Sequence, residues 1–176
     1  WETALKSIAS ESECPRYGGL SMGPQVGLMP LGQNPKSGLW EFYAPLTGAP
    51  PMWNSASGEY GIGKDTAVVL ILVPGATFAM GGQGDPWAES DEFPPQQVAL
   101  DAYFLGKHEV TQAQYERITG SNPSDYFWDP TSGELLLHHP VENVGWDEAR
   151  RCALRLGMDL PTEAQWEWAA RAGLAD

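Results

Sequence analysis

The segment at residues 159–170, DLPTEAQWEWAA, constrains the fold of this chain more than any other stretch. Pro161 lacks the amide hydrogen that a strand ladder needs, whereas Thr162 is a favourable N-cap for a helix. Gln165 follows three residues later, where its side chain reaches back to the N–H group of the cap and completes a capping box. The segment therefore predicts an extended stretch that turns into a helix starting at Thr162.

Strands are predicted in the middle of the chain. The continuous apolar run at residues 67–73 is rich in β-branched side chains, which is typical of a buried strand. It ends at Pro74-Gly75, which suits a type II turn, and the alternating residues 77–80 then predict a hairpin with that strand. Residues 97–105 also alternate and predict a further strand.

Three more helices are expected. Residues 1–13 place apolar side chains on one face, and Cys14-Pro15 ends that helix. Thr111 and Gln114 form a second capping box, for a helix that ends at Gly120. The last of the three helices spans residues 146–156.

The charge of the chain restricts its partners. Its 176 residues include 23 acidic and 10 basic side chains, which gives a net charge of −13. Nucleic acid and anionic membranes would be repelled, so we expect neither as a partner. The longest apolar run is too short to span a bilayer, and no signal peptide is visible. The chain starts with Trp rather than Met, so its natural N-terminus is expected upstream, and the sequence assigns no compartment.

The composition indicates a loop-rich protein in two parts. Eight Trp, twenty Gly and fifteen Pro suit irregular turns anchored by large aromatic rings. Residues 1–65 are predicted to form an N-terminal extension, with a short helix followed by Gly- and Pro-rich strands and loops. Residues 66–176 are predicted to form the second part.

Four blocks of the second part, in order, resemble the formylglycine-generating enzyme (sulfatase-modifying factor) family. They are VPGATFAMG at residues 73–81, residues 92–111 with the triplet Glu109-Val110-Thr111, PVENVGWDEA at residues 140–149, and the segment at residues 159–170. Residues 17–48 also resemble an extension of bacterial members, some of which carry this module after a protein kinase domain.

The resemblance implies an irregular α+β fold, related to C-type lectins, with little regular secondary structure. It covers only the N-terminal half of the family domain, so we expect residues 66–176 to be truncated before the C-terminal half. Family enzymes oxidise a protein cysteine to formylglycine with copper held by two cysteines. Those cysteines and the structural calcium loops lie in the missing half, so we expect no catalytic residue, copper site or calcium site in this chain.

Two functions therefore stay open. The chain is interpreted as part of a formylglycine-generating-enzyme-like domain that is inactive alone and needs its C-terminal half. The alternative is a non-catalytic module of the same fold that binds a protein, peptide or glycan, linked to a signalling kinase. Whether the intact protein is an enzyme is left open.

Glu109 is the one candidate for substrate binding. It matches the Glu of the family triplet Glu-Val-Thr, which lies near the substrate groove of the enzymes. A carboxylate just before a helix N-terminus is also favoured electrostatically, so a purely structural role stays open.

The other candidate side chains favour structural interpretations. Cys14 and Cys152 lie far apart in the sequence and are expected to be buried thiols. His138-His139 could suggest a metal site, but neighbouring side chains on an extended chain point to opposite faces. The acidic residues Asp85, Glu89, Asp91 and Glu92 lack the EF-hand spacing and are expected to be a solvated loop rather than a calcium site.

Three positions in the helical blocks carry further expectations. Trp146 and Trp166 are predicted to be core anchors, with a groove lining as the alternative. Asp159 stands where the family has Arg, which reverses the charge at a position expected to form an ion pair.

Overall fold

The computed structural model describes residues 1–82, 86, 87 and 89–172, except for the side chain of Asp91. The chain packs into two compact units, Trp1–Leu72 with Phe104–Leu160, and Val73–Tyr103 with Pro161–Asp176. The predicted domain boundary between residues 65 and 66 stays a prediction. No helix of the described residues is long and apolar enough to cross a membrane.

The first unit is built from short elements. These are α1 (Glu2–Ile8), η1 (Pro15–Tyr17), β1 (Met29–Gln33), β2 (Trp40–Tyr43), η2 (Pro45–Thr47), β3 (Trp53–Asn54), β4 (Glu59–Tyr60), β5 (Val69–Val73), β8 (Tyr103–Gly106), α2 (Gln112–Thr119) and α3 (Trp146–Leu154). The last residue of β5 and the first residue of β8 are assigned to the second unit.

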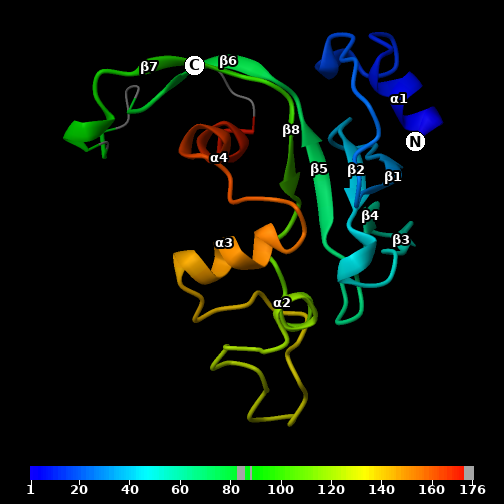
Figure 1. Cartoon of the computed structure of the whole chain (residues 1–176), viewed down its shortest axis with the longest axis vertical. Helices are drawn as coiled ribbons and strands as arrows, with labels where there is room; N and C mark the ends of the chain where they lie inside the picture. Colours follow the sequence, from blue (N-terminus) through cyan, green and yellow to red (C-terminus); the bar gives the residue numbers. More distant parts are fainter. Residues whose placement is uncertain (83–85, 88, 173–176) are drawn as a thin grey trace. The chain divides into compact units, whose positions relative to one another are not determined.

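A four-stranded sheet, in the order β1-β2-β5-β8, organises the first unit (Figure 1). β2 pairs antiparallel with both β1 and β5, and its register places Phe42 opposite Leu70. Phe42 is fully buried and meets Phe104 edge-on, with 5.0 Å between the ring centroids. Trp1 stacks on Phe42 at 5.2 Å. Strands distant in the sequence thus share one aromatic core.

The buried hydroxyl of Tyr17 connects the N-terminal segment to this sheet. It donates a hydrogen bond to the Leu72 carbonyl at 3.0 Å and accepts one from the Trp40 amide at 2.8 Å. Burial raises the pKa of Tyr17 to about 12, although the Trp40 hydrogen bond acts in the opposite direction. The phenol is therefore neutral and fully hydrogen-bonded at ordinary pH.

The described residues of the second unit form a strand pair, a 3-10 helix and an α-helix. β6 (Ala76–Met80) pairs antiparallel with β7 (Gln96–Leu100), and the connection contains the 3-10 helix η3 (Ser90–Glu92) and a cis Phe93-Pro94 peptide bond. α4 (Glu163–Ala170) contacts both strands. Its Trp168 packs on Phe78, with 5.2 Å between the ring centroids, and donates from Nε1 to the Pro74 carbonyl at 3.3 Å.

The strand at residues 67–73 is present as β5, but the predicted hairpin with residues 77–80 is wrong. β5 pairs with β2, whereas β6 pairs with β7. The strand predicted at residues 97–105 is likewise split at Asp101-Ala102 into β7 and β8. A Cβ atom on Gly75 would lie 2.6 Å from the Leu100 carbonyl oxygen, so this close backbone approach requires glycine.

The helix starts follow the sequence closely. Both predicted capping boxes are confirmed: Gln114 N donates to Thr111 Oγ1 at 3.3 Å, and Gln165 N donates to Thr162 Oγ1 at 3.2 Å. Gly120 ends α2 with a φ of 90°, in the left-handed region. The first helix, α1, is shorter than predicted and ends at Ile8. Helices and short strands together confirm the predicted α+β class.

Trp146 and Trp166 are not core residues. Their exposed fractions are 66% and 64%, whereas that of Trp168 is 9%. Residues two positions apart on a helix point to nearly opposite sides, so only one of Trp166 and Trp168 faces β6 and β7. Asp159 forms the predicted type of ion pair, through three hydrogen bonds of 2.9, 3.3 and 3.0 Å from Arg150.

A candidate ligand-binding pocket

A pocket of about 450 Å³ opens in the first unit beside the start of α2. Three chain segments meet there: the loop after β4, the link from β8 to α2, and the end of the long loop between α2 and α3. Its lining residues are Ile62, Lys107, His108, Glu109, Thr111, His138 and Pro140.

Backbone hydrogen bonds fix the walls of the pocket. The Lys107 amide donates to the Val69 carbonyl at 2.9 Å, which ties the link to β5. The Val141 amide donates to the Val110 carbonyl at 2.9 Å, and Thr111 forms an isolated antiparallel bridge with Pro140. The link between β8 and α2 is therefore held from both sides, and its side chains have a defined position.

Glu109, the substrate-binding residue predicted from the sequence, lines this pocket. It is exposed, and among the described residues it has no ion-pair partner. It also lies two residues before the N-cap Thr111, where the helix dipole favours a carboxylate. This position is compatible with substrate binding and with a purely structural role, and the role of Glu109 in binding stays a prediction.

Two imidazoles share the pocket with this carboxylate. Partial desolvation lowers the pKa of His108, and the neighbouring Lys107 charge lowers it further, so the ring is neutral at pH 7. His138 meets His139 edge-on with 4.6 Å between the ring centroids, so the expectation that the two rings point apart is wrong. Together these groups offer hydrogen-bond donors and acceptors around one exposed carboxylate.

The two cysteines lie in separate surroundings. The Cys14 thiol is 3.4 Å from Ser7 Oγ and accepts from Gln33 Nε2 at 3.3 Å. Cys152 lies on α3, where burial raises the pKa of its thiol. Both are buried, which confirms the structural interpretation. Neither lines the pocket, and because they contact different parts of the unit they do not fit a shared copper ion.

The acidic loop of the second unit is only partly described. Asp85 and the side chain of Asp91 lie outside the described residues. The Glu92 carboxylate accepts from the Glu89 amide at 3.1 Å, as part of the capping of η3. No group of three or more His, Cys, Asp or Glu side chains in the described part of the chain could hold a metal ion.

A smaller pocket of about 330 Å³ lies in the second unit. Glu92, Glu163 and Glu167 give it an acidic lining. Glu167 Oε1 accepts from the Gly81 amide at 3.0 Å, and the side chain also pairs with Arg171. These contacts stabilise the unit and give the carboxylate a structural role.

Sequence reasoning did not identify Lys107, His108 or His138 as residues of one pocket. The available signal was the run Lys107-His108-Glu109, three ionisable side chains directly before a helix cap. The convergence of this run with His138 depends on how the long loop returns to α2, which local sequence patterns do not encode.

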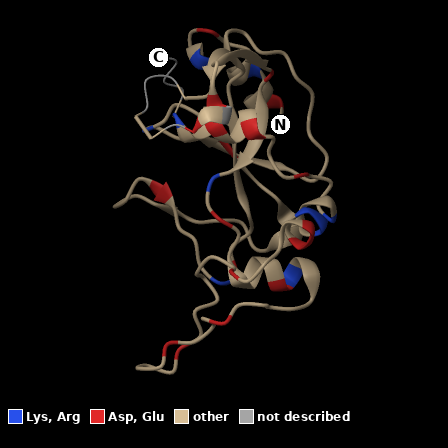
Figure 2. Ribbon diagram, turned by 90° about the vertical axis from the view of Figure 1, so that its left-hand side faces the viewer, with Lys and Arg blue, Asp and Glu red and all other residues tan. Residues whose placement is uncertain are grey.

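The chain as a whole is acidic, with 23 acidic and 10 basic side chains. The acidic side chains are distributed along the whole chain, and the long loop at the lower end of Figure 2 carries acidic side chains but no Lys or Arg. The net charge of −13 therefore favours ligand groups that are cationic or that donate hydrogen bonds.

Comparison with known proteins identifies relatives of most of the chain. Residues 62–176 match the model of the sulfatase-modifying factor enzyme 1-like domain. The formylglycine-generating enzyme of Streptomyces coelicolor is 55% identical over 149 residues, covering 60% of this chain and 48% of that protein. The bovine formylglycine-generating enzyme (Bos taurus) is 28% identical over 150 residues, covering 60% of this chain and 40% of that protein.

A second kind of relative carries a different name. The serine/threonine-protein kinase pkn1 of Chlamydia pneumoniae is 33% identical over 124 residues, covering 60% of this chain and 20% of that protein. The chain thus spans half or less of the length of each of these relatives.

Proposed function

Because this chain belongs to the sulfatase-modifying factor enzyme 1-like domain family, we propose that it forms the peptide-binding part of a formylglycine-generating-enzyme-like domain. In this proposal the pocket beside α2 holds an extended protein segment, and the chain does not oxidise that segment on its own.

The observation that carries the proposal is the position of Glu109. The pocket brings this exposed carboxylate together with His108 and His138, on a backbone fixed by hydrogen bonds on both sides. An extended peptide offers amide donors and side chains that such a carboxylate and two imidazoles recognise. The volume of about 450 Å³ lies within the usual range of ligand-binding pockets, roughly 300–1,000 Å³.

The inactivity of the chain alone is inferred from its two thiols. Copper, which the family resemblance implies, would supply oxidative chemistry when bound between two cysteines. Cys14 and Cys152 are each buried in different surroundings and do not form such a pair. The part of the reaction that these residues support is therefore the binding and orientation of the peptide.

A second candidate is a non-catalytic binding module attached to a kinase. The similarity to the Chlamydia protein kinase favours it, because the matched region there is a small part of a larger protein. The two candidates differ in whether the full-length protein converts cysteine to an aldehyde. Incubating it with a cysteine peptide, copper and oxygen, followed by a hydrazide probe, distinguishes them.

Peptide binding tests the proposal directly. A fluorescein-labelled peptide with a central cysteine and neutral flanks would be titrated with the chain and followed by fluorescence polarisation. Replacing Glu109 by Gln removes the charge at nearly constant volume, and we expect Kd to rise about tenfold or more.

Glu116→Gln is the matched control, because Glu116 is an exposed acid on α2 that does not line the pocket. It should leave Kd unchanged. Equal affinities of wild type and Glu109→Gln would overturn the assignment of the pocket.

A further inference from the structure

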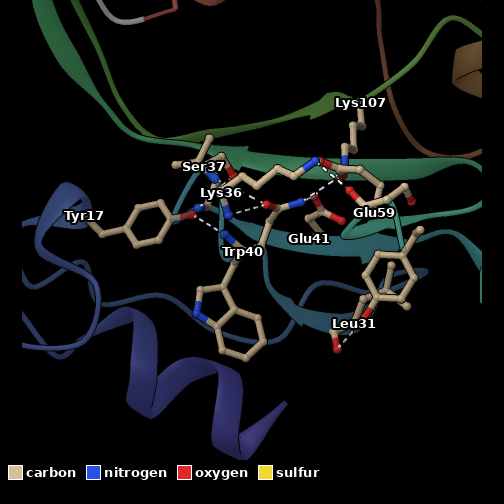
Figure 3. A network of polar contacts seen from close by, with 12 residues as sticks. Tyr17, Leu31, Lys36, Ser37, Trp40, Glu41, Glu59 and Lys107 are labelled. Carbon is tan, nitrogen blue, oxygen red and sulfur yellow. Dashed lines mark hydrogen bonds and ion pairs between the residues drawn. The ribbon is translucent and has the colours of Figure 1, made fainter. Parts of the chain in front are cut away.

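Two carboxylates of the N-terminal segment bind the ammonium group of one pocket residue, Lys107. Lys107 lines the pocket, but its ammonium group lies 2.6 Å from Glu41 Oε1 and also pairs with Glu59 (Figure 3). Glu41 comes from β2 and Glu59 from β4. Both strands lie outside the range matched by the family model, which starts at residue 62.

The cluster of Lys107, Glu41 and Glu59 is held in place by further hydrogen bonds from Asn34. Asn34 Nδ2 donates to Glu41 Oε1 at 2.8 Å and to Glu59 Oε2 at 3.0 Å. Asn34 Oδ1 in turn accepts from the Lys36 amide at 2.9 Å, which fixes the orientation of the Asn34 amide. The exposed fractions of the side chains are 1% for Glu41 and 16% for Lys107. The ammonium therefore has one preferred position, away from free solvent.

This pairing cancels the charge of Lys107. Burial alone would lower the pKa of Lys107, but the hydrogen bonds to Glu41 and Glu59 outweigh it and raise the pKa. The hydrogen bond from Lys107 is also the main reason that the pKa of Glu59 is lowered. Lys107 and Glu59 thus form a stable ion pair, and the ammonium presents little net charge to the pocket.

Glu109 then dominates the electrostatics of the pocket. His108 is neutral at pH 7, and among the described residues Glu109 has no ion-pair partner. Without Glu41 and Glu59, the Lys107 ammonium would stand only two residues from Glu109 with its charge uncompensated.

We propose that Glu41 and Glu59 determine the specificity of the pocket. By neutralising Lys107, these two carboxylates make the pocket select a cationic side chain of the bound segment over an anionic one. This inference rests on the proposed peptide-binding function. It makes the N-terminal segment a functional part of the site, with Glu41 and Glu59 as positioning residues that act through Lys107.

A panel of three labelled peptides tests it. The peptides are identical except for one position beside the central cysteine, which is Lys, Ala or Glu. For the wild-type chain we expect affinities in the order Lys, Ala, Glu. Glu59→Gln should reduce the Lys-to-Glu affinity ratio about tenfold, because one charge is removed at short range.

The same experiment with Lys107→Met should keep or strengthen the preference for the Lys peptide, since no ammonium remains to be neutralised. Glu13→Gln is the matched control, because Glu13 is an exposed acid of the same segment outside the cluster. Glu59 is the more exposed of the two carboxylates, with 35% of its side chain accessible, so its variant is expected to fold even if Glu41→Gln does not.

A readout that needs no ligand accompanies the panel. Glu59 raises and Lys107 lowers the pKa of His108. NMR titration of the His108 ring should therefore show a lower pKa in Glu59→Gln and a higher pKa in Lys107→Met.

The outcomes separate the two proposals. If no peptide binds the wild-type chain, the proposed function fails and the specificity role fails with it. If peptides bind but Glu59→Gln keeps the wild-type Lys-to-Glu ratio, only the role of the carboxylates is overturned. An unchanged His108 pKa in both variants would overturn that role as well.

Discussion

At the scale of single residues, Tyr17 shows how one polar atom holds distant segments together. Its hydroxyl bonds to Trp40 on β2 and to Leu72 on β5, and the whole residue is 7% exposed. A buried donor or acceptor without a partner costs about 1–3 kcal/mol. The Trp40 amide and the Leu72 carbonyl therefore both depend on this phenol.

Tyr17→Phe should lower the free energy of unfolding by about 1–3 kcal/mol, because it leaves two buried backbone groups without their partner. Urea denaturation followed by tryptophan fluorescence measures this. Tyr126→Phe, at a tyrosine that is 75% exposed, serves as the control and should have no effect. Equal stability of both variants would show that the two hydrogen bonds contribute nothing.

The raised pKa of Tyr17 also predicts a dependence on alkaline pH. A folded-state pKa of about 12 against an ordinary value of 10.0 means that the folded chain holds this proton more tightly. The corresponding stabilisation is complete below pH 10 and is lost as the pH rises toward 12. Tyr17→Phe should remove this part of the pH dependence, and a series of denaturation curves between pH 9 and 11.5 checks it.

The two thiols predict weak copper binding. Because Cys14 and Cys152 contact different parts of the first unit, they cannot ligate one ion together in the folded chain. Titration with copper(I) against a competing chelator should therefore show no tight one-to-one complex. A tight complex that is lost in both Cys14→Ser and Cys152→Ser would contradict the structure.

At the scale of elements, α2 and α4 start with the same capping box in different environments. Thr111 is 3% exposed, and Gln114 beside it is also buried and donates to the Thr66 carbonyl at 3.0 Å. Thr162, by contrast, is exposed. The capping box is therefore part of the buried interior at α2, whereas the N-cap of α4 lies on the surface.

Thr162→Ala should lower the free energy of unfolding by about 1 kcal/mol, the usual value for an N-cap. Thr111→Ala should lower the free energy of unfolding by about 1–2 kcal/mol more than Thr162→Ala does, because the amide of Gln114 then loses its partner while buried. Thermal or urea unfolding of both variants gives the difference. The serine variants keep the hydroxyl and should restore most of the stability at each position.

The elements also show which features the sequence predicts. Helix starts at Thr111 and Thr162 depend on side chains three residues apart, so local patterns were sufficient. The partner of β5 depends on β2, about thirty residues earlier, and the predicted hairpin failed for that reason. Glu109 was found through family resemblance, whereas its relation to Lys107, Glu41 and Glu59 requires the register of the sheet.

At the scale of the whole molecule, the sheet of the first unit combines strands from before and after residue 62, where the family match begins. β1 and β2 precede residue 62, yet they pair with β5, which lies inside the matched range. Phe42 of β2 is fully buried against Phe104. The N-terminal segment is therefore part of the core of the first unit.

A fragment of residues 62–176 should consequently fail to fold cooperatively. It would leave β5 without its β2 partner and expose the apolar side chains of Val68 and Leu70, which are 8% and 4% exposed in the full chain. Circular dichroism during thermal unfolding and light scattering check this. A monodisperse fragment with a sharp transition would show that the N-terminal strands are dispensable.

The order of the strands in the sheet has a consequence for synthesis on the ribosome. The β1–β2 pair is complete at Tyr43, but β5, which pairs with the other edge of β2, ends at Val73. At about 5–20 residues per second, elongation between these points takes roughly 1.5–6 s. Throughout that interval the nascent chain presents β2 with an open hydrogen-bonding edge, the kind of surface with which other unfolded chains pair.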